Sequence, residues 1–453
     1  MIAGVVLAGG VGERMNSSIP KLFHNLLGKP IIRYVLENLS GLALNKIIIV
    51  VKSDLKEKFQ YTCGDDFVYV VQDKPLGSGD ALKRAIPELE NFSTVLVVNG
   101  DAPLITTEIL ESLISSHNAD NVSATVLSTV IDDPMHYGRV VKDELGNVIR
   151  IVEAKDATER EKNIKEVNTG AYCFSVDDLR LVIDRMTNNN AQGEYYITQL
   201  IEILSSMGKR VNSYITDLGS LALGINSRFD LSLAIEKLLT EKMEELMQGG
   251  VTIVSPENTY IEPDVKVGRD TVIEPFSVLK GNTVIGENCT IGPSSYLLND
   301  DIGDRCEVFY SVVKNSKIES DVRVGPFAHI RDGAIIKSNA AIGDFVEVKK
   351  SIIGSHTKAM HHSYLGDADI GERVNIGAGV ITCNYDGKNK HKTIIEDGAF
   401  IGSNTNLIAP ITVGRGAVTG AGAVVTKDVE PDTIVVGVPA RILRKKEEGG
   451  KGE

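Results

Sequence analysis

An aliphatic residue recurs at nearly every sixth position through most of the second half of the sequence. The longest run begins at Val267 and continues through Ile273 to Leu297, and later runs cover 324–348 and, with one threonine, 401–425. Glycine follows many of these positions, as in "VIGENCTIG". A sustained six-residue period is typical of a parallel β-helix, in which each aliphatic side chain fills the interior and a turn follows it. The pattern therefore predicts a β-helix of hexapeptide repeats over residues 251–441.

The first half has a different pattern, in which short β-branched runs alternate with amphipathic segments. The runs 2–10, 46–53, 66–73 and 93–101 are typical of strands buried on both faces. Between them, "PIIRYVLENLSG" and "GDALKRAIPELE" have the apolar spacing of helices. Strands and helices in alternation predict a parallel α/β sheet, whose ligands bind at the carboxyl ends of the strands. We therefore expect an α/β domain over residues 1–226.

A third kind of segment joins these halves and a fourth ends the chain. Residues 227–250 carry apolar residues at helical spacing and end at two glycines, which predicts a connecting helix. Residues 442–453 are charged and glycine-rich, and we expect them to be disordered. A chain of 453 residues is also too long for one ordinary compact core, so two domains are expected.

The composition argues against several classes of protein. The formal net charge of −13 disfavours general affinity for nucleic acid or an anionic membrane, but it is compatible with a local pocket that binds phosphates. The five cysteines include no C-x-x-C pair, so neither a disulfide framework nor a zinc site is expected. No apolar run approaches the roughly 20 residues of a membrane span, and "MIAGVVLAGG" lacks the features of a signal peptide. We expect a cytoplasmic protein.

Candidate phosphate-binding and metal-binding residues follow the strands of the first half. The glycines of "LAGGVGERM" would let backbone amides approach a phosphate, and Arg14 and Lys21 add positive charge. Asp101 ends a hydrophobic strand, and Asn226 is an oxygen ligand far along the chain. Mg²⁺ accepts one or two such oxygens and takes the rest from phosphates and water. Without a ligand, the same residues would form only a tight turn and a turn-forming aspartate.

Two adjacent histidines, His361 and His362, are candidates for a catalytic base. Five of the eight histidines lie between residues 329 and 391. If Leu365 points into the β-helix, Ser363 does too, and the histidine pair lies at the preceding corner. Periodicity does not choose between the two histidines, and a histidine at an exposed corner can also have no function.

Charged residues of neighbouring coils give this pair a chemical context. The coils bring Arg331, Lys349 and Tyr364 toward one region, and Glu347 is available to orient an imidazole. Such a cationic cluster suits a sugar phosphate. The repeat also breaks at 381–394, a polar insertion with glycine that predicts either a site-building loop or a tolerated surface loop.

Several motifs give the sequence a resemblance to a known family. They are "LAGGVGERM", "PK", "QDKPLGSGDA", "NGDAPL", "YGR", "IVEAKDAT", "VNTG", "NNNAQGEYYIT" and "GINSR". With this spacing the chain resembles sugar-nucleotide pyrophosphorylases and, more narrowly, the bacterial bifunctional N-acetylglucosamine-1-phosphate uridylyltransferase / glucosamine-1-phosphate N-acetyltransferases. The resemblance runs from residue 2 to about residue 440. It implies a Rossmann-like nucleotidyltransferase domain joined by a helix to a left-handed parallel β-helix.

For the first half, the resemblance implies residues for uridylyl transfer from UTP to N-acetylglucosamine 1-phosphate. Those implied to hold the nucleotide are Ala8, Gly9, Gly10, Gln72, Gly77 and Ser78, and those implied to hold the sugar are Gly138, Glu153 and Asn168. Lys21 and Arg14 would stabilise phosphate charge, and Asp101 and Asn226 would hold Mg²⁺. Two positions depart from the family pattern, since Glu13 stands where Thr is usual and Asn99 where Tyr is common.

For the second half, the family pattern K-A-x-H-x-x-Y-L-G assigns the histidine position to His361. The resemblance implies that His361, with Glu347 behind it, takes a proton from the amino group of glucosamine 1-phosphate as that group attacks acetyl-CoA. Residues implied to bind the sugar phosphate are Arg331, Lys349, Tyr364, Asn375 and Lys390. Asn384 and Tyr385 would lie near the acetyl group, Ser403 and Ala421 would contact coenzyme A, and Arg441 and Arg444 are candidates for a basic contact. The resemblance also implies a trimer whose active sites lie between subunits, so we expect a homotrimer.

Two other functions stay open at this point. The β-helix could serve only the assembly of a pyrophosphorylase, or the whole chain could be a non-catalytic regulatory or scaffold subunit. The presence of Lys21, Asp101 and His361 favours an enzyme with two sites, in which acetylation precedes uridylyl transfer.

Overall fold

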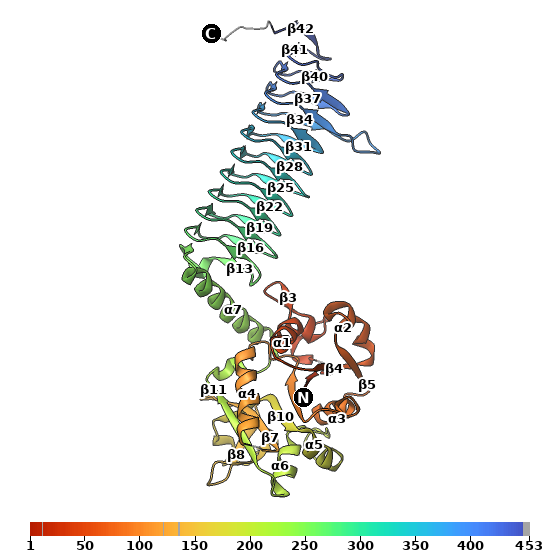
Figure 1. The fold of residues 1–453 in the computed structure, drawn as a ribbon, viewed down its shortest axis with the longest axis vertical. Coiled ribbons are helices and arrows are strands. Elements are labelled where there is room, and N and C mark those ends of the chain that lie inside the picture. Colours follow the sequence, from red (N-terminus) through yellow and green to blue (C-terminus); the bar gives the residue numbers. More distant parts are fainter. Residues whose placement is uncertain (11, 121, 135, 447–453) are drawn as a thin grey trace. The chain divides into compact units, whose positions relative to one another are not determined.

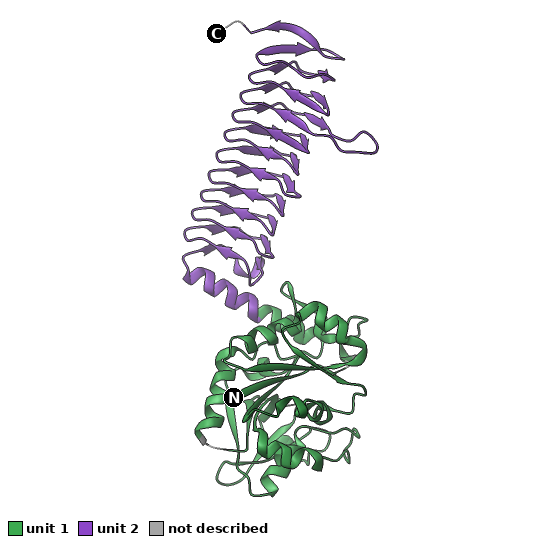
Figure 2. Cartoon of the chain, turned by 45° about the vertical axis from the view of Figure 1, so that its right-hand side comes forward, with its two compact units in different colours: residues 1–236 green, residues 237–453 purple. Residues whose placement is uncertain are grey.

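The computed structural model describes residues 1–10, 12–120, 122–134 and 136–446. The chain divides into two compact units, unit 1 (residues 1–236) and unit 2 (residues 237–453), which Figure 2 shows in different colours. The division falls within helix α7 (Arg228–Gln248), in the segment expected to connect the two halves. Among the described helices, none combines the length and apolar character needed to span a membrane.

Unit 1 is built on a mixed sheet. The strand order is β11 (Val211–Thr216), β7 (Ala124–Val130), β10 (Glu166–Ser175), β6 (Thr94–Asn99), β1 (Ile2–Leu7), β4 (Lys46–Lys52) and β5 (Val68–Gln72). Strands β6, β1, β4 and β5 are parallel, as the alternating pattern predicts, whereas β10 runs antiparallel to both β6 and β7. Strand β8 (Arg139–Lys142) pairs antiparallel with β10, and β9 (Val148–Val152) pairs antiparallel with β8. The alternation of strands and helices therefore predicted the parallel part of the sheet only.

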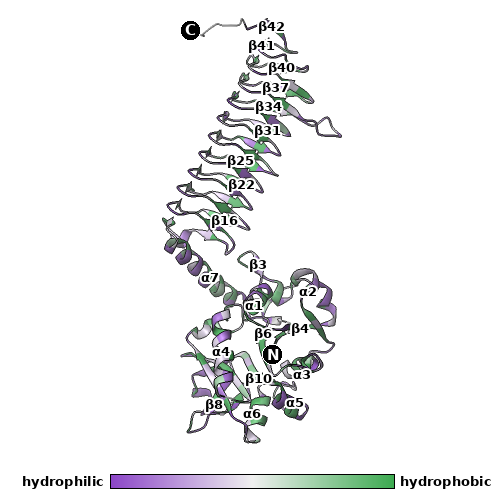
Figure 3. Cartoon of the chain, in the orientation of Figure 1, coloured by the Kyte–Doolittle hydropathy of each residue, from purple (hydrophilic) through white to green (hydrophobic). Residues whose placement is uncertain are grey.

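Helices pack around this sheet (Figure 1). They are α1 (Ile31–Ser40), α2 (Lys56–Cys63), α3 (Ser78–Ala85), α4 (Thr107–Asp120), α5 (Val176–Val182) and α6 (Gln199–Ser206). Helix α1 buries Ile32, Leu36 and Leu39, whose spacing places them on one face. The hydrophobic strands at the centre of the sheet, such as β6, are green in Figure 3, and their burial supplies the core that holds the strand ends in place.

Unit 2 is a left-handed β-helix of hexapeptide repeats, with three faces of short strands that are parallel except for the last strand of the first face. The first face contains β12 (Thr252–Ile253), β15 (Val272–Ile273), β18 (Thr290–Ile291), β21 (Glu307–Val308), β24 (Arg323–Val324), β27 (Ala341–Asp344), β30 (Lys358–His361), β33 (Asn375–Ile376), β36 (Phe400–Ile401), β39 (Val418–Thr419), β41 (Thr433–Val436) and β42 (Arg441–Lys445). The second face contains β13 (Tyr260–Ile261), β16 (Val278–Lys280), β19 (Tyr296–Leu298), β22 (Val312–Lys314), β25 (His329–Arg331), β28 (Glu347–Lys349), β31 (Tyr364–Gly366), β34 (Ile381–Cys383), β37 (Asn406–Ile408) and β40 (Val424–Val425). The third face contains β14 (Lys266–Val267), β17 (Val284–Ile285), β20 (Asp301–Ile302), β23 (Lys317–Ile318), β26 (Ile335–Ile336), β29 (Ile352–Ile353), β32 (Ala368–Ile370), β35 (Thr393–Ile395) and β38 (Ile411–Val413).

The register confirms the six-residue repeat. Ile273 pairs with Ile291, three hexads later, so one turn of the β-helix places one hexad on each face. The aliphatic positions of the repeat fill the interior, and Ile330 and Leu407 have no exposed surface. Val267, in the first turns of the β-helix, is partly buried against the same core.

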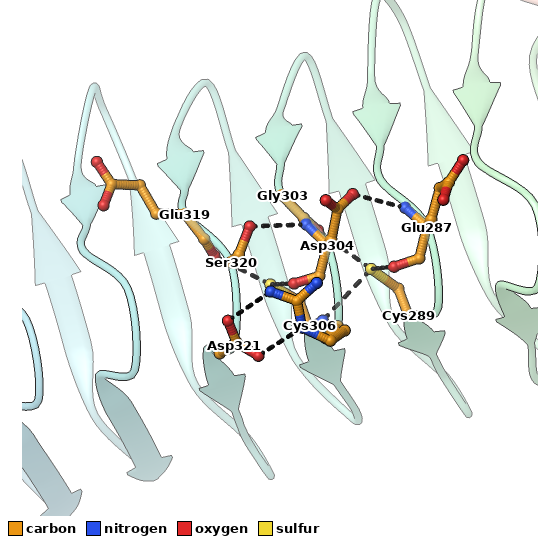
Figure 4. Close-up of polar contacts among 9 residues, drawn as sticks. Glu287, Cys289, Gly303, Asp304, Cys306, Glu319, Ser320 and Asp321 are labelled. Atoms are coloured by element: carbon orange, nitrogen blue, oxygen red, sulfur yellow. Dashed lines mark hydrogen bonds and ion pairs between the residues drawn. The ribbon is translucent and has the colours of Figure 1, made fainter.

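Two buried cysteines inside the β-helix form hydrogen bonds with neighbouring turns. Cys289 and Cys306 occupy the same position in adjacent turns, and both are buried. The Cys289 thiol donates to the Gly303 carbonyl at 3.1 Å, and the Cys306 thiol donates to the Glu319 carbonyl at 3.0 Å (Figure 4). The Cys306 amide in turn donates to the Cys289 sulfur at 3.4 Å. These bonds explain how the interior accepts cysteine among aliphatic residues.

The expectation of a disordered end from residue 442 is wrong for residues 442–446. Strand β42 pairs antiparallel with β41, with Arg444 opposite Ile434 and Ile442 opposite Val435. Backbone pairing with an edge strand orders this segment although its side chains are exposed. Residues 447–453 of the expected tail lie outside the described residues.

Candidate active sites

A cavity of about 280 Å³ lies in unit 1 at the carboxyl ends of β1 and β6. Its lining includes all six residues expected to hold the nucleotide, namely Ala8, Gly9, Gly10, Gln72, Gly77 and Ser78. Gln72 is buried at the end of β5, where its amide donates to the Gly77 carbonyl at 3.1 Å and to Asp80 Oδ2 at 2.9 Å. The fold thus brings three separate segments together around one space at the edge where parallel sheets bind ligands.

The glycine-rich loop after β1 leaves room for Lys21 to reach this cavity. Gly12 has a φ of +72°, and a Cβ there would lie 2.6 Å from the Lys21 Cβ, so any side chain would displace the lysine. Lys21 begins a short 3₁₀ helix, Lys21–Phe23, and its ammonium contacts Asp101 Oδ2. The same ammonium donates to Asn226 Oδ1 at 3.0 Å. The side chain of Glu13, one of the two departures from the family pattern, lies outside the described residues.

Asp101 and Asn226, the expected metal ligands, therefore lie close together. Asp101 follows β6. Asn226 precedes α7, and its backbone N–H donates to Asp230 Oδ2 at 2.9 Å. Within the described part of the chain, Asp101 Oδ1 is buried and has no hydrogen-bond partner. A buried carboxylate oxygen without a partner is costly, and a hard divalent cation would satisfy it. This carboxylate and amide fit Mg²⁺.

A second cavity, of about 250 Å³, adjoins the first and shares Ser78, Asn99 and Asp101 with it. The other expected residues in its lining are Arg14, Gly138, Glu153, Asn168 and Asn226. Glu153 Oε1 accepts a hydrogen bond from the Thr198 hydroxyl at 3.1 Å, and burial raises the pKa of the Glu153 carboxyl. Sequence reasoning assigned no role to Thr198, although it ends the motif "NNNAQGEYYIT". Asn99 borders both cavities, so this departure from the family pattern lies within the site.

In unit 2, the two adjacent histidines have different surroundings. His361 ends β30, and its Nδ1 lies 2.6 Å from Asp344 Oδ1. His362 occupies the next corner, with a φ of 51°, and its ring lies edge-on to Phe345 at a centroid distance of 5.9 Å. Leu365 is buried, as the hexad predicts. Of these two histidines, His361 is the one that contacts a carboxylate.

The expectation that Glu347 lies behind His361 is wrong in this structure. Glu347 Oε1 accepts a hydrogen bond from Arg331 Nε at 2.8 Å, and Glu347 pairs in the register with Tyr364. Asp344 pairs with His361 instead, one turn and 17 residues earlier. A count of 17 residues back from His361 would have found Asp344, but paired residues in adjacent turns are 16 to 18 residues apart, and 25 across the polar insertion, and the sequence does not show which spacing applies.

Positively charged side chains lie at the carboxyl ends of the second-face strands, away from the edge that carries His361. Arg331 and Lys349 lie opposite each other in adjacent turns. The nearby Lys390 ammonium and burial lower the pKa of Lys349. Asp332 lies 2.7 Å from Arg331 and 3.9 Å from Lys349. Because neighbouring positive charges destabilise one another, a phosphate bound here would be favoured.

The polar insertion forms a loop after β34 that projects from the β-helix (Figure 1). Asn384 lies buried at its base and donates to Asp367 Oδ2 at 2.7 Å. Tyr385 and Lys390 pair across the loop. Asn384 also lies 3.5 Å from the Tyr364 hydroxyl, so the loop brings its residues to the second face.

The expected acetyl-transfer residues lie on different edges of the β-helix. His361 lies on the edge between the first and second faces, and Ser403 and Ala421 lie on this edge in later turns. The cation cluster lies at the opposite end of the second-face strands. Asn375 begins a first-face strand and lies at the third edge. A single chain therefore does not gather all these residues at one point.

Known proteins resemble both units. A family model of the MobA-like NTP transferase domain matches residues 4–164, and one of the bacterial transferase hexapeptide (six repeats) matches residues 264–299, 315–350 and 392–427. The chain is 48% identical to "Bifunctional protein GlmU" of Geobacillus sp. (strain WCH70), over 95% of this chain and 94% of the relative. It is 44% identical to a protein of the same name from Caldanaerobacter subterraneus subsp. tengcongensis, over 99% of this chain and 97% of the relative. It is also 44% identical to one from Listeria welshimeri serovar 6b, over 95% of this chain and 94% of the relative. The chain belongs to the GlmU family of bifunctional proteins.

Proposed function

We propose that this protein makes UDP-N-acetylglucosamine in two reactions at two sites. Unit 2 transfers an acetyl group from acetyl-CoA to glucosamine 1-phosphate, and unit 1 then transfers a uridylyl group from UTP to N-acetylglucosamine 1-phosphate. The relatives named as bifunctional support this proposal, as do the two transferase family models that match the two units. The observation that carries it is the His361–Asp344 pair, because a β-helix that served only assembly would need no such base.

At the first site, a phosphate oxygen of N-acetylglucosamine 1-phosphate attacks the α-phosphorus of UTP. The bond between the α-phosphorus and the bridging oxygen breaks, and pyrophosphate leaves. Because no nucleophile of the protein is needed, catalysis comes from positioning and charge stabilisation. The residues that line the two cavities hold the nucleotide and the sugar, and Lys21 and Arg14 face the phosphates. Asp101 and Asn226 would hold Mg²⁺, which supplies further stabilisation of phosphate charge when bound.

At the second site, His361 Nε2 takes a proton from the amino group of glucosamine 1-phosphate. The nitrogen attacks the thioester carbonyl, the carbon–sulfur bond breaks, and coenzyme A leaves as the thiol after it receives a proton. Asp344 accepts the Nδ1 hydrogen and so keeps Nε2 free to accept. Arg331, Lys349 and Lys390 bind the sugar phosphate, and Glu347 positions Arg331.

Coenzyme A is proposed to lie along the edge that carries His361. Ala378, Ser403 and Ala421 take the equivalent corner position in the next three turns, two residues after each paired inward position. Adjacent turns are about 4.8 Å apart, so these small side chains leave an open path along several turns. Asn384 and Tyr385, on the projecting loop, would contact the acetyl end.

The active form is proposed to be a homotrimer in which a neighbouring copy completes each acetyl-transfer site. The separation of the implied residues over three edges supports this proposal. A column of exposed rings also runs along one edge, where Tyr310, Phe327 and Phe345 have successive centroid distances of 5.9 and 5.3 Å. These side chains are 45, 55 and 56% exposed, and an aligned apolar column of this kind is typical of an interface. The proposed location is the cytoplasm, where the proposed substrates UTP and acetyl-CoA would be available.

Product analysis tests this function. The protein would receive glucosamine 1-phosphate, acetyl-CoA, UTP and Mg²⁺, and free thiol and pyrophosphate would be followed separately. We expect both products from the wild type and from His362→Ala. His361→Ala should lose thiol release yet still form pyrophosphate from supplied N-acetylglucosamine 1-phosphate. Pyrophosphate without any thiol from the wild type would show that the β-helix serves only assembly.

A further inference from the structure

The ammonium of Lys21 lies between the two oxygens proposed to bind the metal. It contacts Asp101 Oδ2 and, at 3.0 Å, Asn226 Oδ1. The pair is largely enclosed, with side-chain exposures of 11% for Lys21 and 17% for Asp101. An ammonium and a divalent cation would repel each other at this separation, so the two cannot occupy these oxygens together.

We propose that Lys21 is an internal counter-ion which the metal displaces, and that this exchange makes metal and nucleotide bind cooperatively. The inference rests on the proposed uridylyl transfer and its Mg²⁺. Lys21 also lines the nucleotide cavity, so phosphates bound there can receive the ammonium once it leaves Asp101. The same lysine therefore neutralises the carboxylate in the free protein and the phosphates in the loaded one.

The lysine is an incomplete substitute for the metal. Its ammonium contacts only one oxygen of the carboxylate, and Asp101 Oδ1 remains buried without a hydrogen-bond partner among the described residues. A divalent cation has twice the charge and more coordination positions, so it would satisfy this oxygen as well. The exchange therefore gives both carboxylate oxygens of Asp101 a partner, and it is favourable when the displaced ammonium binds another anion.

Each ligand alone meets an obstacle that the other removes. A metal without nucleotide must drive the Lys21 ammonium out of an enclosed ion pair with no phosphate to receive it. A nucleotide without metal draws Lys21 away and leaves the Asp101 carboxylate uncompensated. With both present, every charge has a partner. By linkage, the metal must then strengthen nucleotide binding by the same factor by which the nucleotide strengthens metal binding.

Binding of Mn²⁺, followed by electron paramagnetic resonance without sugar phosphate, tests the exchange. A blank with UTP and no protein corrects for Mn²⁺ held by free nucleotide. We expect UTP to raise the Mn²⁺ affinity of the wild type at least about tenfold. Lys21→Met should bind Mn²⁺ about tenfold more tightly than the wild type without nucleotide, and should lose most of the gain from UTP. Lys46→Met is the matched control, because Lys46 forms its ion pair with Glu88 instead, and it should behave like the wild type.

The outcomes separate this inference from the proposed function. If Lys21→Met leaves the nucleotide-free Mn²⁺ affinity unchanged while Asp101→Asn abolishes binding, the metal site stands and the exchange is refuted. If the wild type binds no Mn²⁺ even with UTP, the proposed metal site and the exchange both fail. Circular dichroism checks the fold, and Lys21→Gln, which is also neutral, replaces Lys21→Met if the latter does not fold and should show the same gain.

Discussion

Asp344 should control the rate of acetyl transfer through its contact with His361. Its Oδ1 lies 2.6 Å from His361 Nδ1, which is short enough for a charge-assisted hydrogen bond. Such a bond contributes about 1.5–3 kcal/mol. Since each 1.36 kcal/mol of barrier is a factor of ten, its loss corresponds to a rate decrease of about 10- to 150-fold. The side chains are 63% and 38% exposed, so solvent screening places our expectation for Asp344→Asn near the tenfold end.

The substitution acts through the tautomer of the imidazole. An asparagine amide can donate to His361 Nδ1, which would place the ring hydrogen on Nε2 and remove the atom that accepts the substrate proton. Steady-state thiol release would then show a lower kcat with a nearly unchanged KM for glucosamine 1-phosphate. Pyrophosphate release from N-acetylglucosamine 1-phosphate, measured on the same sample, should be unchanged.

Glu347→Gln is the matched control, because it makes the same chemical change three positions later. Glu347 binds Arg331, so its substitution should raise the KM for glucosamine 1-phosphate more than it lowers kcat. If Glu347→Gln instead lowers kcat tenfold or more while Asp344→Asn leaves it unchanged, the geometric assignment of the His361 partner is refuted. The carboxylate implied by the family resemblance would then act on the base.

Three further predictions follow from the two units. Burial raises the pKa of Asp300 to about 7. Because this value exceeds the roughly 3.9 of an unfolded Asp, the folded state binds the proton more tightly, and the stability of unit 2 should fall as pH rises from about 4 to about 7. Asp300→Ser, which installs the residue found one turn later at Ser316, should flatten this slope in calorimetric unfolding, and an unchanged slope would contradict the assignment. Gly77→Ala should weaken UTP binding by about tenfold in titration calorimetry, because Gly77 has a φ of +112° and a Cβ would lie 2.5 Å from the Tyr195 carbonyl oxygen; an unaltered affinity would show that the loop shifts freely. Chelation by EDTA should abolish pyrophosphate release and spare thiol release, because both proposed metal ligands lie in unit 1; loss of both activities would argue against this assignment.

Some features of the protein were already determined by local sequence pattern. The six-residue repeat specified the β-helix, because an inward position such as Ile330 recurs at the spacing of the faces whatever lies elsewhere in the chain. The glycines after β1 and the aspartate after β6 likewise identified the ligand edge of the sheet, because strand ends are visible as the ends of hydrophobic runs. The antiparallel strand β10 carried no such signal, because a buried antiparallel strand has the same hydrophobic run as a parallel one.

Tertiary structure decided which side chains face each other. Lys21 and Asn226 are 205 residues apart, and no periodicity connects them, yet the sheet brings them within 3.0 Å. The partner of His361 depended on the number of residues in that turn of the β-helix, and 17 residues place Asp344 opposite His361 while Glu347 faces Tyr364. Residue pattern determined which positions are buried, because burial depends on local spacing. Contacts between charged groups were decided by the packed chain, because a shift of one residue in register replaces one partner with another.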